Sequence, residues 1–127
     1  MPRLLLVDAD TDACNALARL LRAVGYCVDC AYSGAAAIDH LTRLGADAVI
    51  VDLNMPQLDG WNVLKWTRER LSHATIPVIV HSDLCESHWK LARQMGANEL
   101  WVRGTCSFDA ICDSLEQYGE RVLVAAA

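Results

Sequence analysis

The sequence predicts an α/β fold, a doubly wound sheet of five parallel strands with helices on both faces. Short apolar runs alternate five times with segments whose apolar residues recur at helical spacing, and this alternation requires crossover helices between parallel strands. The apolar runs are continuous, which is typical of strands covered on both faces. The chain has 127 residues, 54% of them hydrophobic, and a single domain of this length can build a substantial core.

The first half of the chain contains three of the expected strands and two of the helices. Gly25 and Gly45 follow the two helical segments as stop signals, and Ser33 is a suitable N-cap for the second. The third apolar run is short and ends on a single carboxylate, Asp52. We therefore expect strands at residues 3–8, 26–31 and 48–52, separated by helices at residues 11–24 and 33–44.

The second half continues the alternation with two strands and three helices. Asp59 or its neighbours open the third helix, and Asp83 with Glu86 three residues later resembles a capping box for the fourth. The fourth helix is expected to end at Gly96 and to turn one side inward, made of Leu84, His88, Leu91, Ala92 and Met95. We expect strands at residues 76–81 and 99–102, and helices at residues 59–71, 83–95 and 107–118.

Charge and hydropathy limit the classes of partner. The net charge is −5 and no run of Lys or Arg occurs, which disfavours direct nucleic-acid binding. The apolar run at the start is too short for a signal peptide, and no run approaches the roughly 20 residues of a membrane span. We expect a cytoplasmic protein that does not enter a membrane.

Six cysteines occur, which we expect to be reduced in a cytoplasmic protein of this size. Cys27 and Cys30 have the CxxC spacing of redox and zinc sites. They lie on an expected strand, where residues three apart point to opposite faces, so the thiols should not converge. His81, Cys85 and His88 are likewise interpreted as unrelated loop and helix residues.

Polar residues collect where the expected strands end. Asp8 and Asp10 follow the first strand, Asp52 the third, Ser82 the fourth and Arg103 the fifth. Because the carboxyl ends of parallel strands share one edge of the sheet, these side chains should lie together. Carboxylates suit Mg²⁺, whereas a hydroxyl and a cation suit phosphoryl oxygens. Asp10 and Asp83 are better explained as helix caps.

The segment VIVDLNMPQLDGW resembles the phosphorylation motif of the bacterial response-regulator receiver family, and the resemblance extends over essentially the whole chain. It implies a flavodoxin-like sheet in the order 2-1-3-4-5. It also implies that Asp52 accepts a phosphoryl group from a histidine kinase or phosphotransfer protein. Asp8, Asp52 and the Asn54 backbone carbonyl would hold Mg²⁺, and Ser82 and Arg103 would bind phosphoryl oxygens. Pro56 should keep Met55 extended.

The resemblance also implies how such a domain works with other proteins. It is a phosphoacceptor with at most slow self-dephosphorylation, not an enzyme. It signals to a downstream protein partner through the face formed by its fourth helix, fifth strand and fifth helix, and homodimers are compatible with that mode. We assign residues 1–120 to the receiver domain. The apolar segment 121–127 extends the last helix, packs on the body or is the stub of a longer parent.

The sequence departs from the family at three places. Ala9 replaces the second of two adjacent acids, so Asp10 would have to supply the missing metal carboxylate. Arg103-Gly104 replaces a Lys-Pro pair, and an Arg fork is not equivalent to a Lys ammonium. Leu100 stands where the family has a switching aromatic residue, with Trp101 on the opposite face of the strand.

These departures leave an alternative open: a pseudo-receiver with the same fold that acts as a constitutive protein-interaction module without phosphorylation. The intact motif around Asp52 favours the phosphoaccepting function. A third interpretation starts from the segment Asp8-Ala9-Asp10-Thr11, which resembles the DxDx start of haloacid-dehalogenase-type phosphatases. Asp12 follows where that motif has Thr or Val, and its further motifs are missing, so we set this interpretation aside.

Overall fold

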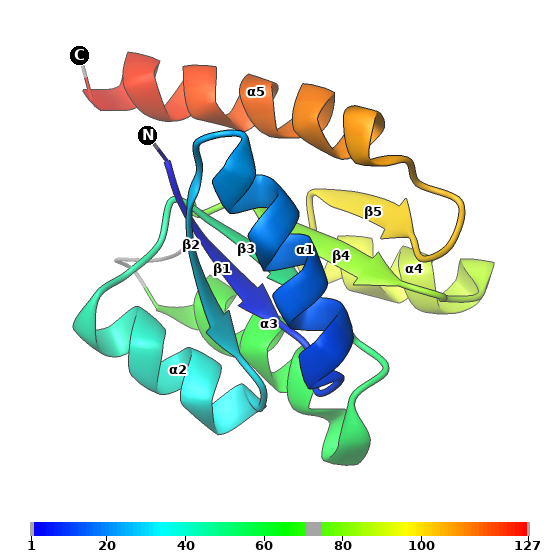
Figure 1. Cartoon of the computed structure of the whole chain (residues 1–127). Helices are drawn as coiled ribbons and strands as arrows, with labels where there is room; N and C mark the ends of the chain where they lie inside the picture. The colour runs from blue at the N-terminus through cyan, green and yellow to red at the C-terminus, as the bar shows by residue number, and fades with distance from the viewer. Residues whose placement is uncertain (1, 71–74, 127) are drawn as a thin grey trace.

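The computed structural model describes residues 2–70 and 75–126. Five parallel strands form one sheet in the order β2-β1-β3-β4-β5, as the sequence predicted (Figure 1). The register pairs Val7 with Val51 and Val51 with Val80, so neighbouring strands end at nearly the same level. The strands are β1 (Arg3–Val7), β2 (Cys27–Ala31), β3 (Ala48–Val51), β4 (Val78–Ser82) and β5 (Glu99–Val102).

Helices cover both faces of the sheet. In Figure 1, α1 and α5 lie on one side of the strands, and α2, α3 and α4 lie on the other. This arrangement is the doubly wound fold expected from the alternation of strand and helix signals. The helices are α1 (Thr11–Ala23), α2 (Gly34–Arg43), the short 3₁₀ helix η1 (Pro56–Leu58), α3 (Asp59–Glu69), α4 (Glu86–Gln94) and α5 (Phe108–Ala126).

The sheet separates two hydrophobic cores. One lies beneath α2, α3 and α4 and includes Val49, Val51 and Val80 from the central strands. The other lies beneath α1 and α5 and includes Leu6, Ile50 and Ile79. Successive residues of each strand therefore enter different cores, which explains the continuous apolar runs in the sequence. This burial on both faces holds the ends of β1, β3 and β4 rigidly.

The fourth helix is where the sequence prediction was wrong. It begins at Glu86, not at Asp83, and its N-cap residue Cys85 makes no side-chain capping bond. His88 and Leu91 are exposed; within the helix only Ala92 is buried. Leu84, Ala92 and Met95 do pack against the core as expected, but the third partly buried position of this face is Trp89, which the prediction had left out.

The last helix differs in length from the expected 107–118. It continues from Phe108 to Ala126, so of the three arrangements considered for the apolar tail the backbone follows the first, an extension of the helix. At the end of the third helix the expected boundary, Leu71, lies outside the described residues. No helix in the described part of the chain has the length and apolar character needed to span a membrane.

Strand alternation is confirmed at the positions that the sequence singled out. Trp101 is buried in the core beneath α1 and α5, whereas Leu100 packs against the opposite core. Cys27 is exposed and Cys30 is partly buried against the α1 and α5 side, and both thiols are free. Within residues 2–70 and 75–126 no group of three or more His, Cys, Asp or Glu side chains is arranged to hold a metal ion.

Candidate functional site

Asp52 is the residue on which the site is centred. It follows the last residue of β3, and its backbone N–H donates to the carbonyl of Val7 at 2.9 Å, which ties it to the end of β1. Its Oδ1 atom accepts hydrogen bonds from the Ser82 hydroxyl and from the backbone N–H of Asn54, the latter at 2.9 Å. Two donors on one oxygen hold the carboxylate in a single orientation.

Ser82 connects Asp52 to β4. It is fully buried at the end of that strand. Its hydroxyl donates to Asp52 and accepts from the backbone N–H of Leu53 at 2.9 Å. The hydroxyl is thus held between two groups of the β3 end, within reach of the Asp52 carboxylate, as the sequence predicted.

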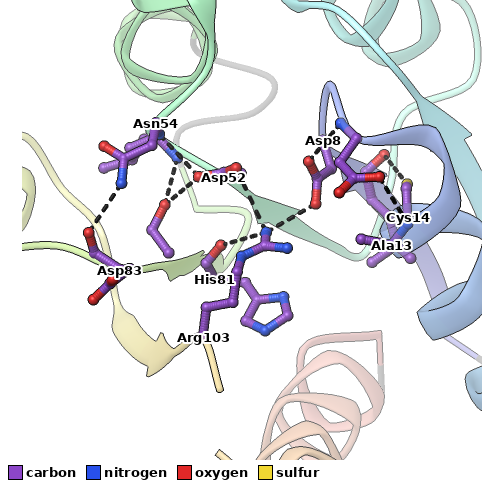
Figure 2. A network of polar contacts seen from close by, with 12 residues as sticks. Asp8, Ala13, Cys14, Asp52, Asn54, His81, Asp83 and Arg103 are labelled. Atoms are coloured by element: carbon purple, nitrogen blue, oxygen red, sulfur yellow. Dashed lines mark hydrogen bonds and ion pairs between the residues drawn. The ribbon is translucent and has the colours of Figure 1, made fainter. Parts of the chain in front are cut away.

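The loop after Asp52 has the conformation that its sequence predicted. Met55 is extended, with φ −96° and ψ 153°, because Pro56 disfavours helix in the preceding residue. The Asn54 side chain donates to the carbonyl of Asp83 at 2.9 Å and so joins this loop to the one that follows β4 (Figure 2). The loop is therefore anchored on both sides of Asp52.

Asp8 supplies the second carboxylate. It is buried at the end of β1, where its backbone N–H donates to the carbonyl of Ala31 at 3.1 Å. Its Oδ1 accepts the backbone N–H of Asp10 at 2.9 Å. Asp10 itself is exposed and caps α1, because its side chain accepts from the Ala13 N–H at 3.1 Å. Asp10 is therefore a helix cap, as its position in the sequence favoured.

Arg103 supplies the positive charge. Its Nη2 atom lies 2.8 Å from Asp8 Oδ2, 3.5 Å from Asp52 Oδ2 and 3.2 Å from the His81 carbonyl oxygen. Figure 2 shows how these three groups surround the guanidinium. Burial alone would lower the pKa of the guanidinium. The hydrogen bond and charge of Asp8, with the charges of Asp52 and Asp10, outweigh burial and raise this pKa above its ordinary value.

The residues at this edge of the sheet fit Mg²⁺ in their chemistry. Asp8 and Asp52 present one carboxylate oxygen each toward a common cation, and hard oxygen ligands are what Mg²⁺ prefers. Asn54 lies directly beside Asp52, as a third oxygen ligand would require. The cation that the two carboxylates share in this structure is the Arg103 guanidinium.

The structure thus brings Asp8, Asp52, Asn54, Ser82 and Arg103 together as the sequence predicted, whereas Asp10 is turned away as the cap of α1. The response regulator receiver domain family matches residues 4–102. The chain belongs to the response regulator receiver family. It is 42% identical to the transcriptional regulatory protein PrrA of Mycobacterium leprae over 81 residues, which is 64% of this chain and 34% of that protein. The receiver therefore spans about a third of this relative.

A second relative and two solved structures extend the comparison. The gliding motility regulatory protein of Myxococcus xanthus is 28% identical over 116 residues, 91% of this receiver and 15% of that protein. A response regulator receiver domain from Francisella superposes with a TM-score of 0.84 at 22% identity, covering 96% of this chain and 99% of that one. The chemotaxis protein CheY4 of Vibrio cholerae gives 0.83 at 21%, covering 93% and 98%. These two likenesses concern the fold.

Two features of the receiver site were missed in the sequence. A Cβ atom on Gly60 would lie 2.1 Å from the Asp52 carbonyl oxygen, so glycine is what lets α3 approach the end of β3. His81 was the second: its backbone carbonyl accepts from Arg103, and its side chain lines a small cavity beside Asp8.

Proposed function

We propose that this receiver accepts a phosphoryl group on Asp52 from a histidine kinase or a phosphotransfer protein, with Mg²⁺ held by Asp8, Asp52 and the Asn54 backbone carbonyl. The observation that carries the proposal is the convergence on Asp52. Its carboxylate stands at the end of a buried strand, with the Ser82 hydroxyl on one oxygen and the Arg103 guanidinium beside the other. The motif VIVDLNMPQLDGW, in which Asp52 stands, is intact in the sequence.

The transfer needs a nucleophile in line with the phosphorus atom and donors for the phosphoryl oxygens. A carboxylate oxygen of Asp52 forms the new O–P bond while the P–N bond to the donor's imidazole breaks, and the bonding electron pair and a proton remain with the imidazole. Mg²⁺, when bound, offsets the negative charge that the phosphoryl group brings. Ser82 and Arg103 donate hydrogen bonds to the phosphoryl oxygens.

We further propose that a downstream protein recognises the phosphorylated state through the surface formed by α4, β5 and α5. Ser82 ends β4, and Arg103 follows β5. A phosphoryl group that draws these two side chains toward Asp52 therefore acts on the ends of both strands. In this proposal the receiver is a phosphoacceptor with at most slow self-dephosphorylation, and its output is contact with a downstream protein.

The test is the intact mass of the protein after incubation with Mg²⁺ and acetyl phosphate. We expect one phosphoryl-sized mass gain in the natural chain and none in Asp52→Asn. The matched control is Asp39→Asn, which removes an exposed carboxylate on α2 far from the site and should keep the gain. A natural chain that gains no mass even at high Mg²⁺ would contradict the proposal and favour the constitutive interaction module.

A further inference from the structure

Arg103 places one nitrogen atom between the two carboxylates of the site. A single nitrogen atom, Nη2, contacts Asp8 Oδ2 at 2.8 Å and the His81 carbonyl at 3.2 Å, and it lies 3.5 Å from Asp52 Oδ2. Two carboxylates on neighbouring strands would repel each other without a cation between them. The guanidinium supplies this cation from within the chain.

The charges at the site explain why the guanidinium competes with a metal. Each additional carboxylate beside a cation site strengthens its attraction for Mg²⁺, and each cation placed there weakens it. Here Ala9 stands in place of one acid, and Arg103 already neutralises part of the charge of Asp8 and Asp52. Asp10, the nearest substitute, is used as the N-cap of α1.

The available space leads to the same conclusion. The cavity beside these residues has a volume of about 20 Å³ and is lined by Asp8, Asp52, His81 and Arg103, together with apolar side chains such as Ile50. That is room for about one water molecule, whereas Mg²⁺ keeps several of its waters when bound by one or two carboxylates. While the guanidinium is in place, this cavity itself is too small to take in a hydrated ion.

We propose that Arg103 is an internal cation that occupies the Mg²⁺ position of this receiver, so that the metal binds only when the guanidinium leaves Asp8 and Asp52. This deepens the proposed function, because it makes metal binding the event that releases Arg103. About a third of the Arg103 side chain is exposed (32%), so the guanidinium has an open path toward solvent. Once it has left the two carboxylates, the guanidinium can donate hydrogen bonds to a phosphoryl group on Asp52.

The test is a titration of the unphosphorylated protein with MgCl₂ at constant ionic strength, followed by amide NMR. The reporters are the backbone N–H groups of Asp10 and Asn54, since they donate to the Asp8 and Asp52 carboxylates. Arg103→Gln should bind Mg²⁺ at least about tenfold more tightly than the natural chain, because a competing cation is removed. The matched control Arg43→Gln removes an exposed arginine on α2 and should leave the affinity unchanged.

Two further arms separate the alternatives. Ala9→Asp restores the second acid; if it tightens Mg²⁺ binding while Arg103→Gln does not, the missing carboxylate alone limits the affinity and the proposal is wrong. Equal affinities in the natural chain and Arg103→Gln would also overturn it. If Arg103→Gln does not fold, the side-chain Nε–H signal of Arg103 in the natural chain decides. It must shift as Mg²⁺ saturates the site, and a constant signal refutes the proposal.

None of these measurements depends on phosphotransfer. A chain that binds Mg²⁺ as described but takes no phosphoryl group would refute the proposed function and leave the competition between Arg103 and Mg²⁺ established. If the natural chain is phosphorylated on Asp52 but Arg103→Gln binds Mg²⁺ with unchanged affinity, the proposed function is supported and the competition between Arg103 and Mg²⁺ is refuted.

Discussion

At the scale of single residues, the geometry around Asp52 depends on a missing side chain as much as on those present. Gly60 lies in the first turn of α3, directly against the backbone of Asp52 and Leu53. An added Cβ would lie 2.1 Å from the Asp52 carbonyl oxygen and 2.8 Å from the Leu53 Cα. Both neighbours are backbone atoms of a buried strand end, so neither can move without shifting the nucleophile.

Gly60→Ala should therefore lower the free energy of unfolding by about 2–3 kcal/mol, the usual cost of overpacking a tight core position. Urea denaturation measures this change. Gly45→Ala is the control, because Gly45 has a φ of +67° and open space around it, so only the conformational cost of about 1 kcal/mol applies. Equal losses in the two variants would show that the close approach to Asp52 is not constraining.

At the scale of secondary-structure elements, one carboxylate fastens α5 to the edge strand. Glu99, the first residue of β5, accepts hydrogen bonds from Trp101 Nε1 at 3.0 Å, the Ser114 hydroxyl at 2.6 Å and the Tyr118 hydroxyl at 2.8 Å. Ser114 and Tyr118 are four residues apart and so share one face of α5. Bonds from two elements thus meet on a single side chain of β5.

Glu99→Ala should lower the free energy of unfolding by about 1–3 kcal/mol, because it removes the acceptor that three partly buried donors share. In the variant, amide hydrogen exchange should become faster in α5 but stay nearly unchanged in α2, which makes no bond to Glu99. Glu69→Ala, which removes an exposed carboxylate at the end of α3, is the control and should change little. Uniform loss of protection across all helices would contradict a local role for Glu99.

The secondary-structure elements also show how much of the fold the sequence predicted. Periodicity predicted all five strands and all five α-helices, since the central strands β1, β3 and β4 are largely buried and each helix turns an apolar side toward the sheet. The start of α4 was missed because Asp83 and Glu86 imitate a capping box, while Asn54 instead uses the Asp83 carbonyl. The positions of the strand ends correctly predicted which side chains meet. They did not predict that Arg103 lies between Asp8 and Asp52, because a sequence pattern does not give the conformation of a long side chain.

At the scale of the whole molecule, His81 couples the site to global stability. Its ring lies edge-on to Trp101, with centroids 6.3 Å apart, and lines the cavity beside Arg103, Asp8 and Asp52. Burial, helped by the positive charge of Arg103, lowers the pKa of His81 below its ordinary value of 6.5, and the two carboxylates only partly oppose this. The folded state therefore favours the neutral imidazole.

This shift fixes the sign of a pH dependence. As the pH falls through 6.5, the unfolded chain takes up a proton at His81 before the folded chain does, so the free energy of unfolding must fall with it. The loss continues until the pH reaches the lower pKa of the folded state.

His81→Gln should remove this component of the pH dependence. The difference in free energy of unfolding between the natural chain and the variant should therefore shrink or reverse between pH 7.5 and pH 5.5. These two values lie about one unit on either side of 6.5. Taking the difference cancels the carboxylates common to both chains, and the exposed His88→Gln serves as the histidine control. Parallel stability curves for the natural chain and His81→Gln in urea would show that His81 titrates alike in both states, and would remove the link between this buried ring and the stability of the receiver.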